Sequence, residues 1–249
     1  MTLHPNLHTA FAQGHALKII SGLTNFDLTN VLAVAKAAQQ GGATFVDIAA
    51  DADLVRQVSQ HISLPICVSA IDPEAFLAPV AAGATLIEIG NFDAFYAQGL
   101  RFEAKDVLTL TQRTRELLPH IMLSVTVPHT LPLNEQVQLA EDLVAMGADI
   151  IQTEGGTSTK PVHPGTLGLI EKATSTLAAA HAISRAVRIP VLCASGISDV
   201  TAPMAIAAGA AGVGVGSAVN KLKSEIAMIA AVRRLHEALQ TVTRSAEKV

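Results

Sequence analysis

Aromatic residues are scarce in this chain. Phenylalanine, tyrosine and tryptophan make up 3% of the 249 residues, with one tyrosine and no tryptophan. Alanine, valine, leucine and isoleucine must therefore fill the core, because hydrophobic residues still account for 50% of the chain. Alanine-rich helices together with valine- and isoleucine-rich strands favour a layered α/β architecture.

Cysteine residues are also few, and charge is not concentrated in a basic cluster. Cys67 and Cys193 both fall within expected strands, where a buried free thiol is the usual interpretation. No spacing of cysteine and histidine is typical of a zinc site, so we expect no bound metal. The net charge is −4 and no basic cluster stands out, which argues against nucleic acid as a partner.

Signals for export or membrane insertion are not found either. The first residues, MTLHPNLHTAFAQGHALK, lack a basic start followed by an apolar run, so we expect no signal peptide. No apolar stretch is long and uniform enough to predict a membrane span. The two cysteines are expected to be free thiols, and no export signal is expected. Both expectations favour a reducing compartment, the cytoplasm.

Short apolar runs alternate with amphipathic segments along the whole chain. The runs predict strands at Ala16–Leu23, Ala43–Asp51, Leu64–Asp72, Leu86–Asn91, Ile121–Val127, Ile150–Glu154, Pro190–Ser195 and Gly212–Gly216. The segments predict helices at Leu28–Gln40, Ala52–His61, Pro73–Ala82, Lys105–Leu118, Leu133–Met146, Leu169–Val187, Val200–Ala208 and Leu222–Leu239.

Eight unbroken strand–helix units predict a (β/α)8 TIM barrel that spans residues 1–249 as a single domain. The chain is close to the ~250 residues typical of this fold. A doubly wound open sheet is the alternative, but it usually has a glycine-rich loop after its first strand, where this chain has SGLTNFD. Residues 1–15 are expected to form a short N-terminal arm, with Phe11 at the barrel floor.

The segment Ile189–Leu222 carries the clearest functional pattern. Ser195-Gly196 and Gly216-Ser217 follow the seventh and eighth expected strands, and a helix is expected to start near Ser217. Glycine backbone N–H groups and a helix start suit an anion. In a TIM barrel, the loops after these two strands form the usual phosphate site. We therefore expect a small phosphorylated metabolite as the ligand.

The loop after the sixth expected strand is long and rich in glycine, serine and threonine. Gly155, Gly156 and Lys160 lie in its sequence, TEGGTSTKPVHPG. Its amides, hydroxyls and amine suit an oxyanion or a polar substrate. Lys160 is equally consistent with a surface lysine in a flexible lid.

Four ionisable residues lie inside expected strands, where a side chain faces either the barrel interior or the helices. Because a charge packed against the helices is costly, we expect Lys18, Asp47, Glu88 and Glu154 to point inward. Lys18 and Asp47, on adjacent strands, are expected to pair. The group is either a structural ion network or a catalytic one. In the second case Lys18 is an electrostatic anchor or an amine nucleophile, and a carboxylate carries the proton.

Other polar residues near strand ends have simpler interpretations. Asp51, Asp72 and Asp93 begin or precede helices and are interpreted as caps. His129 and His163 lie in loops, where a lone histidine is more often unreactive, and of the two only His163 is kept as an acid/base candidate.

The ending SGIS…AAGAAGVGVGSAV resembles the phosphate-binding signature of the ribulose-phosphate-binding barrels, within the aldolase-type superfamily. Thiazole synthase and N-acylmannosamine-6-phosphate 2-epimerase have similar endings, but their catalytic lysine has no match here. The whole chain, including HTAFAQGHALKIISGLTNFD and IQTEGGTSTKP, resembles an uncharacterised cyanobacterial and plastid-encoded family of TIM barrels. This resemblance implies the fold and a photosynthetic source, hence the plastid stroma as an alternative compartment. The resemblance to the wider ribulose-phosphate-binding superfamily implies that Gly196, Gly216 and Ser217 hold phosphate-gripping positions.

We therefore expect an isomerase, lyase or synthase that acts on a small phosphorylated metabolite. One alternative is an FMN-dependent oxidoreductase, because Gln152–Gly156 resembles the glycine-rich loop of nitronate monooxygenase-like enzymes. A non-enzymatic sensor that binds its ligand at the same phosphate site is another alternative. The apolar last helix, with its IAMIAAV run, packs either on the barrel or on a second copy of the chain, which leaves a homo-oligomer open.

Overall fold

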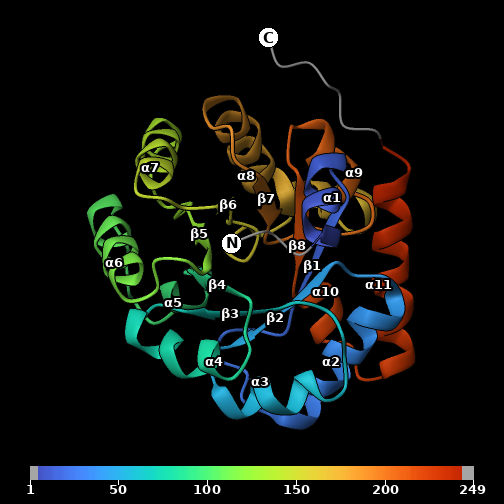
Figure 1. Cartoon of the computed structure of the whole chain (residues 1–249). Coiled ribbons are helices and arrows are strands. Elements are labelled where there is room, and N and C mark those ends of the chain that lie inside the picture. The colour runs from blue at the N-terminus through green and yellow to red at the C-terminus, as the bar shows by residue number, and fades with distance from the viewer. Residues whose placement is uncertain (1–4, 243–249) are drawn as a thin grey trace.

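Eight parallel strands close into a barrel, paired in chain order, in the computed structural model, which describes residues 5–242 (Figure 1). This confirms the predicted (β/α)8 barrel. The strands are β1 (Ala16–Ile20), β2 (Phe45–Ala49), β3 (Ile66–Ala70), β4 (Leu86–Ile89), β5 (Met122–Thr126), β6 (Ile150–Gln152), β7 (Val191–Ala194) and β8 (Gly212–Val215).

Helices surround the ring of strands (Figure 1). They are α1 (Pro5–Gln13), α2 (Leu28–Gly41), α3 (Ala52–Ser59), the 3-10 helix η1 (Pro73–Phe76), α4 (Leu77–Ala81), α5 (Asp93–Tyr96), α6 (Ala104–Leu117), α7 (Leu133–Ala145), α8 (Gly165–Ala186), α9 (Ala202–Ala207), α10 (Ser217–Asn220) and α11 (Glu225–Gln240). No helix within residues 5–242 is long and apolar enough to cross a membrane.

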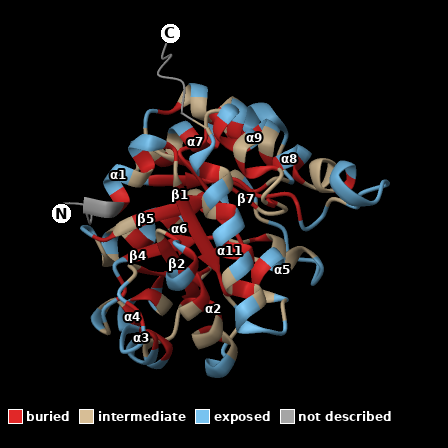
Figure 2. Cartoon of the chain, turned by 90° about the vertical axis from the view of Figure 1, so that its right-hand side faces the viewer, coloured by how far each residue is buried: buried red, intermediate tan, exposed pale blue. Residues whose placement is uncertain are grey.

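The alternation of side chains along the strands creates two separate apolar clusters. Ile19, Val46 and their counterparts face outward and pack against the helices. Phe45 and Leu86 face the barrel interior near its floor, where Leu7 and Phe11 of α1 join them. The ring of Phe11 lies 6.2 Å from that of Phe45, which confirms the floor position predicted for Phe11. Figure 2 shows the buried strands enclosed by helices whose outer faces are exposed.

The strands are shorter than the apolar runs suggest, and the segment after β8 differs from the prediction. The helix start expected near Ser217 is confirmed, because α10 begins there, but the helix predicted from Leu222 begins only at Glu225, as α11. The Asn220 side chain ends α10 by donating hydrogen bonds to the carbonyls of Ile20 (3.0 Å) and Ser21 (3.1 Å). These bonds attach α10 to the end of β1 and hold the chain at the barrel mouth before α11 starts.

The last helix packs on the barrel, which is one of the two arrangements that the sequence predicts for it. Met228, Val232 and Leu235 of α11 are buried in the outer apolar cluster, whereas Ile226 is exposed. α11 lies directly against α2: a Cβ atom on Gly41 would stand 2.4 Å from Cβ of Val232. The first and last helices of the barrel ring therefore meet at a glycine.

Candidate functional site

Lys18 lies at the centre of a buried polar network inside the barrel. Its Nζ atom donates hydrogen bonds to Glu88 Oε2 (2.7 Å) and Gln152 Oε1 (3.0 Å), and it lies 3.1 Å from Asp47 Oδ2. The ion pair that adjacent strands predict for Lys18 and Asp47 is thus confirmed. The inward orientation predicted for Lys18, Asp47 and Glu88 is confirmed as well.

Glu88 accepts four hydrogen bonds in this network. Its Oε2 accepts from Lys18 and from Ser124 (2.8 Å), and its Oε1 accepts from Asn91 (2.9 Å) and Gln152 (2.6 Å). Every neighbour comes from a different strand or strand end, because inward side chains of a closed barrel converge on its axis. The side chain of Glu88 is therefore held from all sides.

The network keeps Lys18 charged and out of reach of a ligand. Burial by itself lowers the pKa of Lys18, but the charges of Asp47 and Glu88 outweigh it and raise the pKa above 10.5. Burial raises the pKa of Glu88. The side chain of Lys18 is 0% exposed. A protonated, enclosed amine is not a nucleophile, so burial and charge argue against the amine-nucleophile role expected for Lys18.

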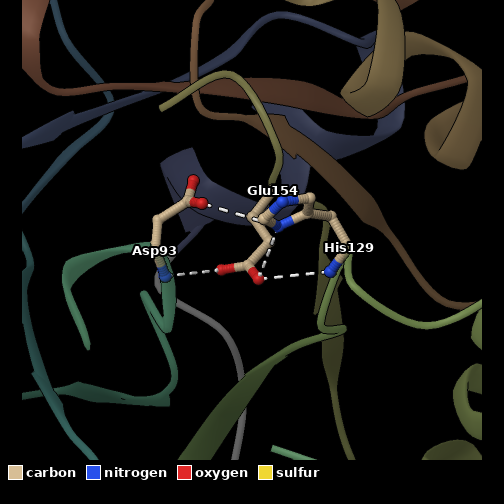
Figure 3. A group of neighbouring side chains, drawn as sticks. All are labelled: Asp93, His129 and Glu154. Atoms are coloured by element: carbon tan, nitrogen blue, oxygen red, sulfur yellow. Dashed lines mark hydrogen bonds and ion pairs between the residues drawn. The ribbon is translucent and has the colours of Figure 1, made fainter. Parts of the chain in front are cut away.

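A second polar group, here called the mouth cluster, consists of Asp93, His129 and Glu154. Glu154 Oε1 accepts hydrogen bonds from the backbone N–H of His129 (3.2 Å) and lies 3.2 Å from His129 Nδ1. Glu154 Oε2 accepts from the backbone N–H of Asp93 (3.1 Å). Figure 3 shows the three side chains converging from three loops, after β4, β5 and β6. Glu154 therefore belongs to the mouth cluster and not to the group around Lys18.

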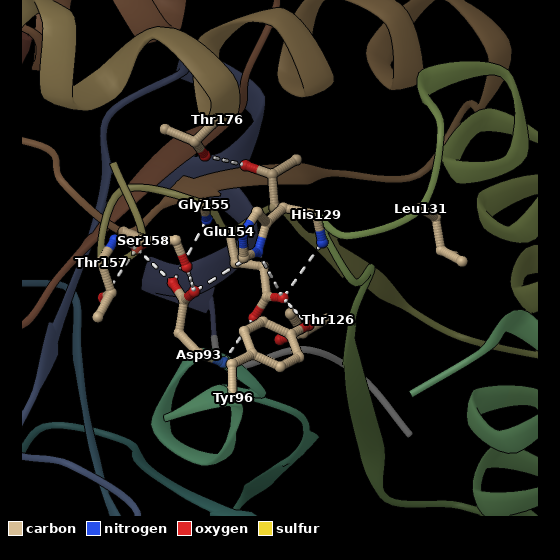
Figure 4. A network of polar contacts seen from close by, with 12 residues as sticks. Asp93, Tyr96, Thr126, His129, Leu131, Glu154, Gly155, Thr157, Ser158 and Thr176 are labelled. Atoms are coloured by element: carbon tan, nitrogen blue, oxygen red, sulfur yellow. Dashed lines mark hydrogen bonds and ion pairs between the residues drawn. The ribbon is translucent and has the colours of Figure 1, made fainter. Parts of the chain in front are cut away.

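Neighbouring residues fix the mouth cluster in place. Tyr96 donates a hydrogen bond from its hydroxyl to Glu154 Oε1 (2.5 Å), and its ring stands edge-on to the imidazole of His129. Asp93 Oδ2 accepts hydrogen bonds from the Ser195 hydroxyl (2.7 Å) and the Gly155 N–H (3.3 Å). Figure 4 shows Asp93, Tyr96, His129, Glu154 and Gly155 together, on the segments that follow β4, β5 and β6.

The environment shifts the pKa values of the cluster in one direction. Burial raises the pKa of Glu154. The hydrogen bond to Glu154 raises the pKa of His129 above 6.5. Burial, followed by the charge of Glu154, raises the pKa of Tyr96, which therefore stays protonated as a donor. The cluster thus favours a proton on His129, between two carboxylates.

The glycine loops expected to bind phosphate lie next to the mouth cluster, because Ser195, which bonds Asp93, directly precedes Gly196. Gly156 and Gly196 touch backbone to backbone: a Cβ on Gly156 would stand 2.4 Å from the Ser195 carbonyl oxygen. Among the described residues, the backbone N–H groups of Gly196, Gly216 and Ser217 have no acceptor. All three residues directly follow the ends of β7 and β8.

Two non-glycine residues at the site adopt a left-handed backbone conformation. Asn91, after β4, has φ 60°, and Ser195, after β7, has φ 70°. Such conformations cost energy for an L-residue and cluster at functional sites. Asn91 bonds Glu88 of the inner network, and Ser195 bonds Asp93 of the mouth cluster. Each of the two polar groups is therefore hydrogen-bonded to one residue with a strained backbone.

Other sequence candidates lie apart from the mouth cluster. Lys160 is exposed on the loop between β6 and α8. The side chain of His163 is 56% exposed and lies 2.5 Å from Glu171 Oε1.

Asp51 and Asp72 cap α3 and η1 as predicted. The interpretation of Asp93 as a cap is wrong, because it makes no side-chain cap hydrogen bond. As the first residue of α5, it points its carboxylate at Ser195 instead.

Asp93, Tyr96 and His129 are the site residues that sequence reasoning missed. All three follow strand ends on the side where barrel active sites form, and that position was the available signal. Pro128 and Pro132 flank the His129 loop and restrict its backbone. Gln136 donates to the Leu131 carbonyl (2.7 Å) and steadies the same loop.

A cavity of about 1070 Å³ opens at the opposite end of the barrel. It lies between α1 and the loops that precede β3 to β7, and Phe11, Arg115 and Ile150 are among its lining residues. Arg115 is already engaged by Asp149 and by the Ile121 carbonyl. Because this face of a TIM barrel usually contributes stability and not catalysis, we place the candidate site at the mouth.

Solved structures with the same fold include two synthases. GGGPS from Thermoplasma volcanium superposes with a TM-score of 0.68 at 12% sequence identity, covering 98% of this chain and 99% of that one. The (S)-3-O-geranylgeranylglyceryl phosphate synthase from Thermoplasma acidophilum, in complex with its substrate sn-glycerol-1-phosphate, gives 0.63 at 14%, covering 97% and 100%. At these identities the similarity shows the fold alone.

Sequence relatives cover nearly the whole chain. The protein ycf23 of Cyanophora paradoxa is 48% identical over 218 residues, which are 87% of this chain and 89% of that one. The ycf23 protein of Pyropia yezoensis is 38% identical over 240 residues, 96% and 88% of the two chains. A family model described as "Protein of unknown function (DUF561)" matches residues 3–245. The chain therefore belongs to the DUF561 family, together with these ycf23 proteins.

Proposed function

We propose that the protein is an enzyme, an isomerase, lyase or synthase, that acts on a small phosphorylated carbonyl compound at the barrel mouth. The observation that carries the proposal is the direct contact between the two halves of the site. Ser195 joins the glycine loops to the mouth cluster through its 2.7 Å hydrogen bond to Asp93. A ligand whose phosphate lies on the glycines therefore has its other end beside Asp93, His129 and Glu154.

In this proposal the phosphate is bound by the backbone N–H groups of Gly196, Gly216 and Ser217. Such donors suit a phosphate because they approach it closely and cost no side-chain entropy. The stem of Lys172 packs beside Gly196, because its Cγ atom would lie 3.1 Å from a Cβ on that glycine. Gly155 and Gly156 lie beside this position, since Gly155 donates to Asp93 and Gly156 packs on Gly196. The fold is shared with a synthase whose substrate carries a phosphate, which agrees with this reading.

The chemistry we propose is proton transfer next to a carbonyl group. Protonated His129 would place positive charge at the ligand's carbonyl oxygen as negative charge develops there. The carboxylates beside it, Glu154 and Asp93, would accept the proton from carbon. Lys18, Asp47 and Glu88 are positioning residues here, because they are buried beneath the site and act through Asn91 and the loop after β4.

The test is hydrogen–deuterium exchange in D2O, followed by NMR, on a panel of small phosphorylated aldehydes and ketones. We expect the wild-type protein to exchange the hydrogen beside the carbonyl of at least one compound. The His129→Gln variant should lose about 10²–10⁴-fold in exchange rate, the usual contribution of a positioned acid or base. Gly216→Asp should abolish binding, because its carboxylate would repel the phosphate.

Three outcomes would contradict the proposal. Tight binding of a phosphorylated compound without any exchange or turnover would indicate a sensor. A flavin absorption spectrum in the purified protein would indicate the FMN-dependent alternative. Full exchange activity in His129→Gln would place the chemistry elsewhere.

A further inference from the structure

Three potential metal ligands converge at the barrel mouth. One oxygen of Asp93, Nδ1 of His129 and one oxygen of Glu154 all lie within 4.8 Å of one another (Figure 3). His129 Nδ1 is 3.5 Å from Asp93 Oδ1 and 3.2 Å from Glu154 Oε1. Two ligands about 2.1 Å from one ion, at tetrahedral or octahedral angles, are about 3.0–3.4 Å apart. Both spacings to His129 are close to this range, and the third pair of ligand atoms lies within 4.8 Å.

The surrounding contacts hold these ligands in position, as the outer contacts of metal sites do. The Tyr96 hydroxyl and the backbone N–H groups of His129 and Asp93 fix the carboxylate of Glu154. The Ser195 hydroxyl and the Gly155 N–H fix Oδ2 of Asp93, while Oδ1 accepts a 3.4 Å hydrogen bond from the Ser158 hydroxyl and lies on the side of His129. The geometry is therefore set before any ion arrives.

The charge balance at this point also calls for a cation. The side chains of Asp93 and Glu154 are 10% and 3% exposed, and His129 is the basic group between them. Arg101 lies over the Tyr96 ring and donates to the carbonyls of Tyr96 and Leu100, not to either carboxylate. Two carboxylates in a largely dry site are costly without a balancing positive charge, which a bound metal ion would supply.

We propose that Asp93, His129 and Glu154 bind one divalent transition-metal cation of the Zn²⁺ or Mn²⁺ class. The imidazole ligand argues against Mg²⁺ and Ca²⁺, which prefer oxygen. Three protein ligands leave coordination positions open for water or a ligand. The site rests on these side chains alone, and only the ion's action on a substrate rests on the proposed function. There the ion would supply, in place of the His129 proton, positive charge at the carbonyl oxygen.

Cobalt titration tests the proposal without any phosphorylated ligand. Wild-type protein treated with EDTA and then dialysed should develop visible Co²⁺ absorption that saturates at one ion per chain, and calorimetry should give the Mn²⁺ affinity. Losing an outer contact costs about 10–100-fold in metal affinity, so losing a direct ligand should cost about 100-fold or more. We expect this loss in both Asp93→Asn and His129→Gln, with circular dichroism confirming that each variant is folded.

His163→Gln is the matched control. His163 also has its Nδ1 beside a carboxylate, Glu171, but it is exposed and has no second carboxylate partner among the described residues. Its substitution should leave the Co²⁺ affinity unchanged. No Co²⁺ absorption, or unchanged affinity in folded Asp93→Asn, would overturn the site. Proton exchange by protein that binds no Co²⁺ would remove this inference alone, and Co²⁺ binding without exchange would remove the proposed function alone.

Discussion

At the scale of single residues, the barrel interior holds charge where most barrels hold apolar side chains. Lys18, Asp47 and Glu88 are all at most 1% exposed, and their charges do not cancel as a pair, since two carboxylates surround one amine. Removing one member of a buried ion network costs more than the network contributes, because the remaining charges are left without a partner.

We expect Lys18→Met to destabilise the protein by about 3–5 kcal/mol. Because the folded pKa of Lys18 is raised, its contribution is fully present below the unfolded value of 10.5 and is lost as pH rises through the higher folded value. The difference in unfolding free energy between wild type and variant should thus persist at neutral pH and shrink only above 10.5. Urea denaturation over a pH series measures it.

Lys160→Met is the matched control for this substitution. Lys160 is exposed on a loop, so the same change there should alter stability by less than about 0.5 kcal/mol. A Lys18→Met variant as stable as this control would show that the buried ion network is not formed in solution.

At the scale of residues, the sequence predicts the direction of side chains within strands, where they alternate between two faces. A charged residue within a strand has two possible directions, and the cost of facing the helices selects one, so the orientation of Lys18 and Glu88 was predictable. Asp93 and His129 lie outside the strands, where no period constrains direction. Their contacts depend on loops that are distant in sequence, and pattern alone does not pair them.

At the scale of elements, the loops after β6 and β7 pack backbone against backbone. A Cβ on Gly156 would stand 2.4 Å from the Ser195 carbonyl oxygen and 2.5 Å from Gly196 Cα, and these backbone atoms cannot move aside cheaply. A Cβ on Gly216 would meet no atom closer than 3.6 Å. The first glycine is therefore needed for packing, and in the proposed function the second leaves space for the anion.

Alanine at each position separates these two roles. Gly156→Ala should lower stability by about 1–3 kcal/mol, as overpacking usually does. Gly216→Ala should keep wild-type stability but weaken binding of inorganic phosphate about tenfold, or about 1.4 kcal/mol. Thermal unfolding and phosphate titration measure the two effects. Unchanged phosphate affinity in Gly216→Ala would place the anion site away from β8.

At the scale of the whole molecule, the barrel is completed where its first and last ring helices meet. Gly41 of α2 lies against Val232 of α11, and the missing side chain lets the two helices approach closely. Gly41 and Val232 are far apart in the sequence, so the contact forms only when the barrel closes. It stabilises the closed ring and not any single strand–helix unit.

We expect Gly41→Ala to destabilise the fold by about 1–3 kcal/mol, because its Cβ would overlap Val232 and approach the Arg233 backbone. Alanine alone would favour the helix by about 1 kcal/mol, so a loss must come from the packing. Gln40→Ala, which places the same methyl group on the exposed neighbouring position of α2, should be nearly neutral. Guanidinium denaturation of both variants checks this, and equal stability would contradict close packing of α2 on α11.

The sequence by itself determined the barrel, its strand order and the inward direction of its charged residues, because periodicity and burial cost act locally along the chain. It also indicated the glycines after β7 and β8. Only the tertiary structure decided that Glu154 contacts Asp93 and His129 and not the group around Lys18. That choice depends on three loops meeting at the mouth, and a contact between segments 25 to 61 residues apart leaves no repeating signal in the sequence.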